Sequence, residues 1–214
     1  MLKVSEVFHS IQGESTRAGR PCVFVRLAGC PQRCVWCDTP GSLTADGAAL
    51  MSIEEILARV AYHGTPLVEV TGGEPLAQGA DTQELLRALC DAGYEVMLET
   101  SGAFAIEEVD ARVRRIMDIK CPDSGESHRT RWKNLESLRL DRDEIKFVVS
   151  GRSDYEWVRS LVRDEEKLKL ATRAALLYSP VYGQLAPSML ARWLLEDRLP
   201  GRLQIQLHKT LDLP

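Results

Sequence analysis

Three cysteines lie within the eight residues Cys30-Pro-Gln-Arg-Cys34-Val-Trp-Cys37, in the spacing Cys-x3-Cys-x2-Cys. A structural zinc ion takes four protein ligands in a tetrahedron, and no histidine lies near this segment to complete such a set. A [4Fe–4S] cluster has four irons, so three thiolates bind three of them and leave the fourth open to an outside ligand. The triplet therefore favours a reactive iron–sulfur site over a closed structural metal site.

A second motif, Thr71-Gly-Gly-Glu-Pro75, follows the apolar run Leu67–Val70. Alone, Gly-Gly and Glu-Pro predict only a turn. Together, the cysteine triplet and this motif resemble the signatures of the radical S-adenosylmethionine (SAM) enzymes. The resemblance implies that the three thiolates hold a [4Fe–4S] cluster and that SAM chelates the open iron. Reductive cleavage of SAM would then supply a 5′-deoxyadenosyl radical.

Four further segments narrow the resemblance: Phe8–Ser15, Cys37–Thr39, Glu99–Gly102 and Gln206–Pro214. Their order and spacing resemble the 7-carboxy-7-deazaguanine synthase family over essentially the whole chain. That resemblance implies a lyase that converts 6-carboxy-5,6,7,8-tetrahydropterin to 7-carboxy-7-deazaguanine with loss of ammonia. The reaction belongs to queuosine and deazapurine biosynthesis, a branch of purine metabolism that supplies tRNA modification.

The resemblance also implies the roles of individual residues, although none is expected to be catalytic itself, since the cofactor radical carries the chemistry. The residues expected to bind the substrate are Gln12, Gly13, Glu14, Arg26, Thr71, Glu99, His208 and Pro214, the last through its α-carboxylate. Those expected to border SAM are Trp36, Cys37, Asp38, Gly73, Glu74, Ser101, Cys121, Pro122, Asp123, Ser179, Pro180, Val181 and Tyr182. The Thr39 hydroxyl is expected to hold Mg²⁺, which would also bind the substrate carboxylate.

These side chains suit such ligands chemically. Gln12 and Glu14 can satisfy donors and acceptors on the aminopyrimidine edge of a pterin, and Arg26 can pair with an anionic group. Mg²⁺ prefers oxygen ligands and usually retains water, so one hydroxyl plus the substrate is a reasonable set. Each assignment has a structural alternative: a solvated strand end for Gln12 and Glu14, a helix cap for Thr39, and a frayed tail for the C-terminus.

Two parts of the expected SAM site depart from the family pattern. They are Cys121-Pro-Asp123 and Ser179-Pro-Val-Tyr182. The departures concern individual hydrogen bonds rather than the location of the site. Lys120 and Lys146, at neighbouring strand ends, are candidates for nearby cations, because a strand-end lysine that is buried normally has a partner.

The elements that must position these residues follow an alternating α/β pattern. Strands are predicted near 23–27, 68–70, 96–98, 116–119, 145–149, 175–177 and 204–207, and helices at 53–61, 82–91, 106–112, 155–164 and 187–195. Ser52 and Glu55 predict a capping box at the first helix. Alternation predicts a parallel sheet, whose strand ends converge on one site in barrel-type folds. The radical SAM resemblance implies a partial βα barrel of about six parallel strands, trimmed to fit this length.

Composition sets broad limits. With 214 residues, 44% hydrophobic and 27% charged, the chain is expected to form one domain over residues 1–214. The net charge of −4 argues against a general nucleic-acid grip. With no secretory signal and no apolar run of membrane-spanning length, a cytoplasmic protein is expected. The cysteines outside the triplet are therefore expected to be reduced, with Cys22 and Cys90 in the core.

Partners and rival functions remain to be weighed. A radical SAM enzyme needs a reductant such as flavodoxin, and a short barrel with exposed strand edges suggests a homodimer. One alternative is a glycyl-radical activase, which would share the cluster but need a protein partner. Another is a non-enzymatic electron-transfer, iron–sulfur or zinc module. Iron content and turnover of the carboxypterin distinguish these readings.

Overall fold

The computed structural model describes all residues from Met1 to Pro214. Nine strands form one open sheet in the order β3-β1-β2-β4-β5-β6-β7-β8-β9. The strands are β1 (Leu2–Ile11), β2 (Pro21–Leu27), β3 (Ala49–Met51), β4 (Leu67–Gly72), β5 (Glu95–Thr100), β6 (Arg114–Asp118), β7 (Glu144–Val149), β8 (Ala175–Pro180) and β9 (Arg202–Leu203). The α-helices are α1 (Ile53–Tyr62), α2 (Ala80–Asp91), α3 (Arg152–Val162), α4 (Leu170–Arg173), α5 (Pro187–Asp197) and α6 (Leu207–Leu211).

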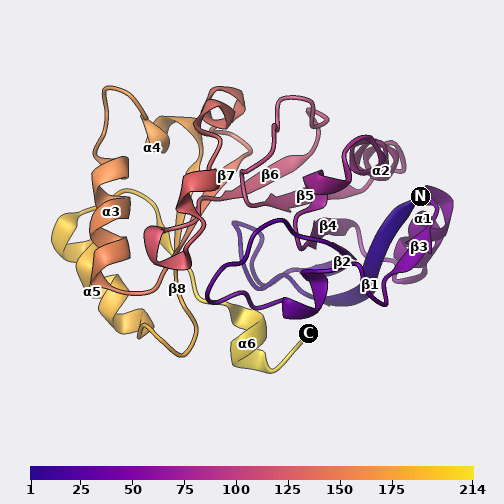
Figure 1. Ribbon diagram of the computed structural model, residues 1–214, viewed down its shortest axis with the longest axis horizontal. Coiled ribbons are helices and arrows are strands. Elements are labelled where there is room, and N and C mark those ends of the chain that lie inside the picture. Colours follow the sequence, from indigo (N-terminus) through magenta and orange to yellow (C-terminus); the bar gives the residue numbers. More distant parts are fainter.

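The parallel part of the sheet runs from β2 through β4 to β8 and ends at the short β9. At the other edge, β1 pairs antiparallel with β2 and with β3. The predicted partial barrel of about six parallel strands is therefore confirmed, with β1, β3 and β9 added at its edges. Figure 1 shows α1 and α2 near the β1 end of the sheet and α3 and α5 near the β8 end, with α6 apart from both pairs.

Strand alternation divides the sheet into two faces. Side chains such as Val68, Val70 and Leu98 face the helices and join a core of 37 buried residues. The opposite, concave face has a small apolar floor formed by Cys22, Phe24, Leu67, Met97 and Ile116. Because that floor is small, the carboxyl ends of the strands leave space above it for polar side chains.

Helix α1 begins as the sequence predicts. The Ser52 hydroxyl accepts a hydrogen bond from the Glu55 amide (3.2 Å), and the Glu55 carboxylate accepts one from the Ser52 amide (2.7 Å). The capping box is confirmed. None of the helices combines the length and the hydropathy that crossing a bilayer requires.

Two predicted elements are wrong. Residues 106–112 form turns instead of a helix. The Asp110 carboxylate accepts a hydrogen bond from the Arg112 amide (2.9 Å), an Asx-type contact that competes with helical bonding. The expected strand at 204–207 is also absent: the sheet ends at Leu203, and α6 begins at Leu207. The physical reason lies in the site, since the Leu207 amide donates to the Gly13 carbonyl (3.1 Å) and draws the chain away from the sheet.

Candidate active site

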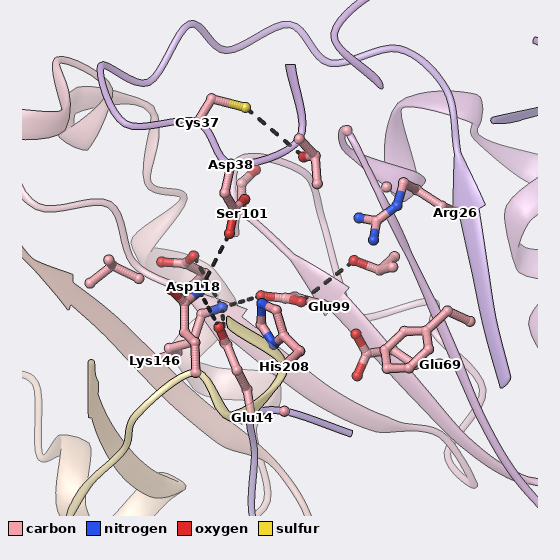
Figure 2. Close-up of a pocket in the computed structure, with 18 of the residues that line it drawn as sticks. Glu14, Arg26, Cys37, Asp38, Glu69, Glu99, Ser101, Asp118, Lys146 and His208 are labelled. Carbon is pink, nitrogen blue, oxygen red and sulfur yellow. Dashed lines mark hydrogen bonds and ion pairs between the residues drawn. The ribbon is translucent and has the colours of Figure 1, made fainter. Parts of the chain in front are cut away.

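A cavity of about 620 Å³ opens at the carboxyl ends of the parallel strands. Its wall includes the cysteine loop, the turn after β1, the ends of β4 to β7 and the C-terminal segment. Figure 2 shows its charged side chains pointing toward one another. Cavities of several hundred Å³ are typical of small-molecule sites, and this edge is where α/β folds bind ligands.

The period of two along each strand explains which side chains enter the cavity. In β4, Glu69 and Thr71 share the inner face with the floor residue Leu67. In β6, Asp118 follows the floor residue Ile116 at the same spacing. Each strand therefore passes from an apolar side chain on the floor to a polar one at the cavity wall.

Lys146 of β7 lies at the centre of a cluster of carboxylates (Figure 2). Its ammonium group pairs with Glu14 (2.6 Å), with Glu99 and, at 3.6 Å, with Asp118. Asp118 also pairs with Lys120 (2.8 Å). Burial alone would lower the pKa of Lys146, but the attraction of Glu14, Glu99 and Asp118 holds that pKa well above its usual value. The lysine is therefore charged, and its partners have a fixed cation in the cavity.

Glu69 is a second buried carboxyl group in the cavity. Its Oε2 accepts a hydrogen bond from Gln12 Nε2 (2.5 Å), and the Gln12 Oε1 accepts one from the Glu14 amide (2.9 Å). Burial and the nearby Glu99 raise the pKa of Glu69 well above its usual value. Both ends of the Gln12 amide thus have partners within the chain, which makes the side chain a rigid part of the cavity wall.

The C-terminal segment closes the cavity from the side opposite the cysteine loop. A Cβ atom on Gly13 would lie 2.1 Å from His208 Nδ1, so a glycine is required where the turn after β1 meets α6. Gln206 donates to Glu14 (2.6 Å), and Lys209 pairs with Asp38 (3.3 Å). These contacts bring the last residues over the cavity.

The terminal residue is held in place. Ser10 Oγ donates a hydrogen bond to the terminal Pro214 oxygen (2.9 Å), and Pro214 lines the cavity. The Leu213 amide also donates to the His208 carbonyl (2.9 Å). The tail is therefore tied to β1 and α6, as the expected substrate role requires.

The three loop cysteines line the same cavity, are half-buried and form no disulfide. The loop is held by backbone bonds from the Cys30 amide to the Leu43 carbonyl (3.1 Å) and from the Val35 amide to the Ser124 carbonyl (3.1 Å). No three His, Cys, Asp or Glu side chains are placed to bind one single metal ion. A cluster places each thiolate on a different iron, and thiolates are the ligands it prefers. The donor set thus fits a [4Fe–4S] cluster with one open iron.

The Gly-Gly-Glu turn packs directly beneath this loop. A Cβ atom on Gly73 would lie 2.5 Å from the Gly29 carbonyl oxygen, so only glycine allows the close approach. The next residue, Glu74, is fully buried and turns away from the cavity. Its carboxyl group accepts hydrogen bonds from the Leu76 amide (3.0 Å), the Ser101 amide (2.7 Å) and the Thr100 hydroxyl (2.9 Å). Glu74 therefore supports Ser101, which does line the cavity.

Thr39 and Arg26 lie where the main cavity meets a second one of about 410 Å³. The Thr39 hydroxyl makes no capping hydrogen bond to the short 3₁₀ helix that follows it. Arg26 pairs with Glu6 (2.7 Å) and lies over the Phe8 ring, 5.4 Å from its centroid. Thr39 does not act as the side-chain cap that was its structural alternative, and Arg26 is held in place on the cavity wall.

The structure brings together most of the residues expected from the sequence. The cavity wall includes every residue expected to bind the substrate, all three cysteines and Thr39. Of the residues expected to border SAM, it includes Trp36, Cys37, Asp38, Gly73, Ser101, Val181 and Tyr182. Six others lie outside it: Glu74, Cys121, Pro122, Asp123, Ser179 and Pro180.

Burial by the chain itself accounts for the main differences. Cys121 is 1% exposed, and burial raises the pKa of its thiol well above the usual value. Ser179 is fully buried, and Asp123 accepts a hydrogen bond from the Ser150 hydroxyl (3.1 Å). The SAM contacts expected of these residues stay predictions, and in this conformation the cavity does not reach them.

Sequence reasoning missed Glu69 and Asp118, because attention was given to residues after the strands instead of within them. The available signal was an acidic residue inside an apolar run, as in Leu67-Val-Glu-Val. A charged residue inside a buried strand normally has a partner or a function. At a spacing of two from Thr71 and Lys120, respectively, both acids are placed by that rule on the cavity face.

Known proteins agree with this site. Residues 25–119 match the sequence profile of the Radical SAM superfamily. The 7-carboxy-7-deazaguanine synthase of Chlorobaculum tepidum is 46% identical, covering 98% of this chain and 94% of that protein. The synthase of Koribacter versatilis is 40% identical, covering 100% and 98%. A crystal structure of QueE from Escherichia coli has a TM-score of 0.77 at 24% identity, covering 96% of this chain and 93% of that one, and shows the shared fold.

Full-length identity of this degree goes well beyond a shared cysteine motif. It includes the cluster loop, the Gly-Gly-Glu turn, the polar strand ends and the C-terminal segment, which here surround one cavity. The chain belongs to the 7-carboxy-7-deazaguanine synthase family of radical SAM enzymes.

Proposed function

We propose that this protein converts 6-carboxy-5,6,7,8-tetrahydropterin to 7-carboxy-7-deazaguanine with loss of ammonia. One observation carries the proposal: the three free thiols and all the expected substrate-binding residues share one cavity. Relatives that are 46% and 40% identical over nearly the whole chain are named for this product, which supports the assignment. The similarity favours neither a glycyl-radical activase nor a non-enzymatic iron–sulfur or zinc module.

Cys30, Cys34 and Cys37 would hold the [4Fe–4S] cluster, and the adjoining wall would hold SAM. Bound together, they supply a 5′-deoxyadenosyl radical. The chain contributes binding, orientation and exclusion of water. Ser101 and the backbone of Gly73, both on the wall beside the cysteine loop, offer polar groups to SAM.

The substrate would lie on the side of the cavity farther along the sheet. Glu14 and Glu99 offer carboxylate oxygens to ring N–H donors, and the Pro214 carboxylate offers another acceptor. Arg26, held over Phe8, faces the same space and can accept an anionic group. Charged acceptors and one guanidinium on a single wall match a ring that has both N–H donors and a carboxylate.

We assign Mg²⁺ to Thr39 as part of this proposal. The free Thr39 hydroxyl, at the junction of the two cavities, supports it. Thr39→Ala should weaken the magnesium dependence of turnover and leave the iron content unchanged, whereas Thr39→Ser should retain that dependence. A Thr39→Ala protein with the parent's magnesium titration would contradict the assignment.

The biological setting is part of the same proposal. The chain would act as one domain over residues 1–214, supported by a single sheet with strands from Leu2 to Leu203. A flavodoxin-type reductant, a cytoplasmic location and a place in queuosine biosynthesis follow from the reaction. The exposed side chains Leu203 (40%) and Ile205 (40%) at the β9 edge support a homodimer.

The test is an anaerobic assay of the reconstituted protein with 6-carboxytetrahydropterin, SAM, Mg²⁺ and a chemical reductant. Product is identified by mass spectrometry, and ammonia is measured in parallel. We expect both to form in equal amounts. If SAM is reductively cleaved but the pterin is unchanged, the protein is a radical SAM enzyme with another substrate, and the proposal is wrong.

A further inference from the structure

The buried Lys146 ammonium connects side chains from three separate elements. Glu14 lies in the turn after β1, Glu99 on β5 and Asp118 on β6, while Lys146 itself is on β7. All three carboxylates pair with the one nitrogen. The lysine side chain is only 5% exposed. A single group therefore sets the relative positions of three parts of the cavity wall.

Two of these carboxylates are expected to contact the substrate, and each is held at both oxygens. Glu14 has Oε2 on Lys146 and Oε1 on Gln206 Nε2 (2.6 Å). Glu99 has Oε1 on Lys146, and its Oε2 accepts a hydrogen bond from the Thr71 hydroxyl (3.5 Å). The ammonium is the contact that the two carboxylates share.

Stability alone does not account for such a cluster. Burying an ammonium and three carboxylates has a large desolvation cost, and apolar side chains of similar volume are often as stabilising. What the ammonium does provide is a positive charge that keeps adjacent carboxylates ionised. Asp118 illustrates this, because burial raises its pKa while Lys120 and Lys146 together lower the pKa below its usual value.

We propose that Lys146 is a positioning residue for the substrate, which fixes Glu14 and Glu99 in their ionised form and in one orientation. This inference rests on the proposed function, because it takes the substrate to be the carboxypterin. Without the ammonium, Glu14, Glu99 and Asp118 would face one another as like charges. At least one of them would then take up a proton and lose its charge-assisted hydrogen bond to the substrate.

The first experiment uses Lys146→Met, which retains the length of the side chain without its charge. We expect the KM for 6-carboxytetrahydropterin to rise about 10- to 100-fold. The kcat should fall by much less, since the interaction is made to the bound substrate as well as the transition state. Reductive cleavage of SAM without substrate and the iron content should match the parent. The control is Lys133→Met, at an exposed lysine, which should leave all these values unchanged.

The second experiment adds Glu99→Gln to Lys146→Met. If Lys146 acts by neutralising the carboxylates, removing one of them relieves the repulsion. The combined change in KM should then be smaller than the product of the two single changes. A product equal to the single effects, or a Lys146→Met protein whose KM is unchanged, would overturn the proposal.

A third measurement needs no substrate, and so separates this inference from the proposed function. Infrared absorption of protonated carboxylic acids at neutral pH should increase in Lys146→Met and in Lys146→Gln relative to the parent. An unchanged band in both variants contradicts the inference even if the assay succeeds. A parent protein that does not convert the pterin contradicts the proposed function instead. If neither variant folds with the parent's circular dichroism spectrum, Lys146 is a structural residue and the inference is wrong.

Discussion

Replacing Glu74 by glutamine should destabilise the protein, although the family signature suggests a contact with SAM. The Glu74 Oε2 atom accepts hydrogen bonds from the Ser101 amide (2.7 Å) and hydroxyl (2.5 Å), and its Oε1 accepts one from the Leu76 amide (3.0 Å). Glutamine has one oxygen, so its NH₂ group must face either the Leu76 or the Ser101 N–H. One buried donor then has no acceptor.

The size of the effect follows from those contacts. A buried donor left without a partner costs about 1 to 3 kcal/mol, which is the loss expected for Glu74→Gln. Glu74→Ala also removes the acceptor for the other amide and leaves a cavity, so we expect about 3 to 5 kcal/mol. Urea unfolding of the iron-free protein, followed by circular dichroism, measures both losses.

Glu136→Gln, at an exposed glutamate, is the matched control and should change stability by less than about 0.5 kcal/mol. The affinity for SAM is measured separately on the reconstituted protein. A Glu74→Gln variant with the parent's stability but weakened SAM binding would refute the structural reading. It would show that the carboxylate reaches the ligand in another conformation.

Three further predictions follow from the same structure. Alanine at any one of the loop cysteines should abolish full loading with iron and sulfide, whereas Cys90→Ala, in the core, should load like the parent. A tag that extends Pro214 converts its carboxylate to an amide and should raise the substrate KM well above that of an N-terminally tagged protein; equal kinetics would contradict the role of the tail. Because burial raises the folded-state pKa of Glu69, the folded chain retains a proton that the unfolded chain loses above a pH of about 4.3. Stability should therefore fall as the pH rises above that value, and Glu69→Gln should lose less stability between pH of about 5 and about 8 in urea unfolding; parallel curves would argue against it.

Local patterns in the sequence predicted much of the fold and of the site. The capping box at Ser52 and Glu55 defines the start of α1 through contacts within one turn of helix. The spacing of Cys30, Cys34 and Cys37 indicates the cluster loop, since a short loop brings its own thiols together. The order of strands and helices predicts the parallel sheet, because each crossover connects neighbouring strands.

Where the sequence-based prediction was wrong, contacts between distant residues were decisive. Residues 204–207 have a pattern typical of a strand, but Leu207 bonds to Gly13 and Gln206 to Glu14, nearly the whole chain away. Residues 106–112 have helical periodicity, but the Asp110 side chain forms a turn there.

The charges of the cavity show the same division between sequence and tertiary structure. Strand alternation by itself determines that Glu69, Glu99, Asp118 and Lys146 each lie on the concave face of the sheet. Which carboxylate meets which cation depends on the stagger between strands; for example, Asp118 lies beside Lys146 in the register of β6 and β7. Glu14 joins them only because the turn after β1 packs against the C-terminal segment. Periodicity is local and can be predicted from the chain, whereas charge pairing depends on distances that exist only once the sheet has formed.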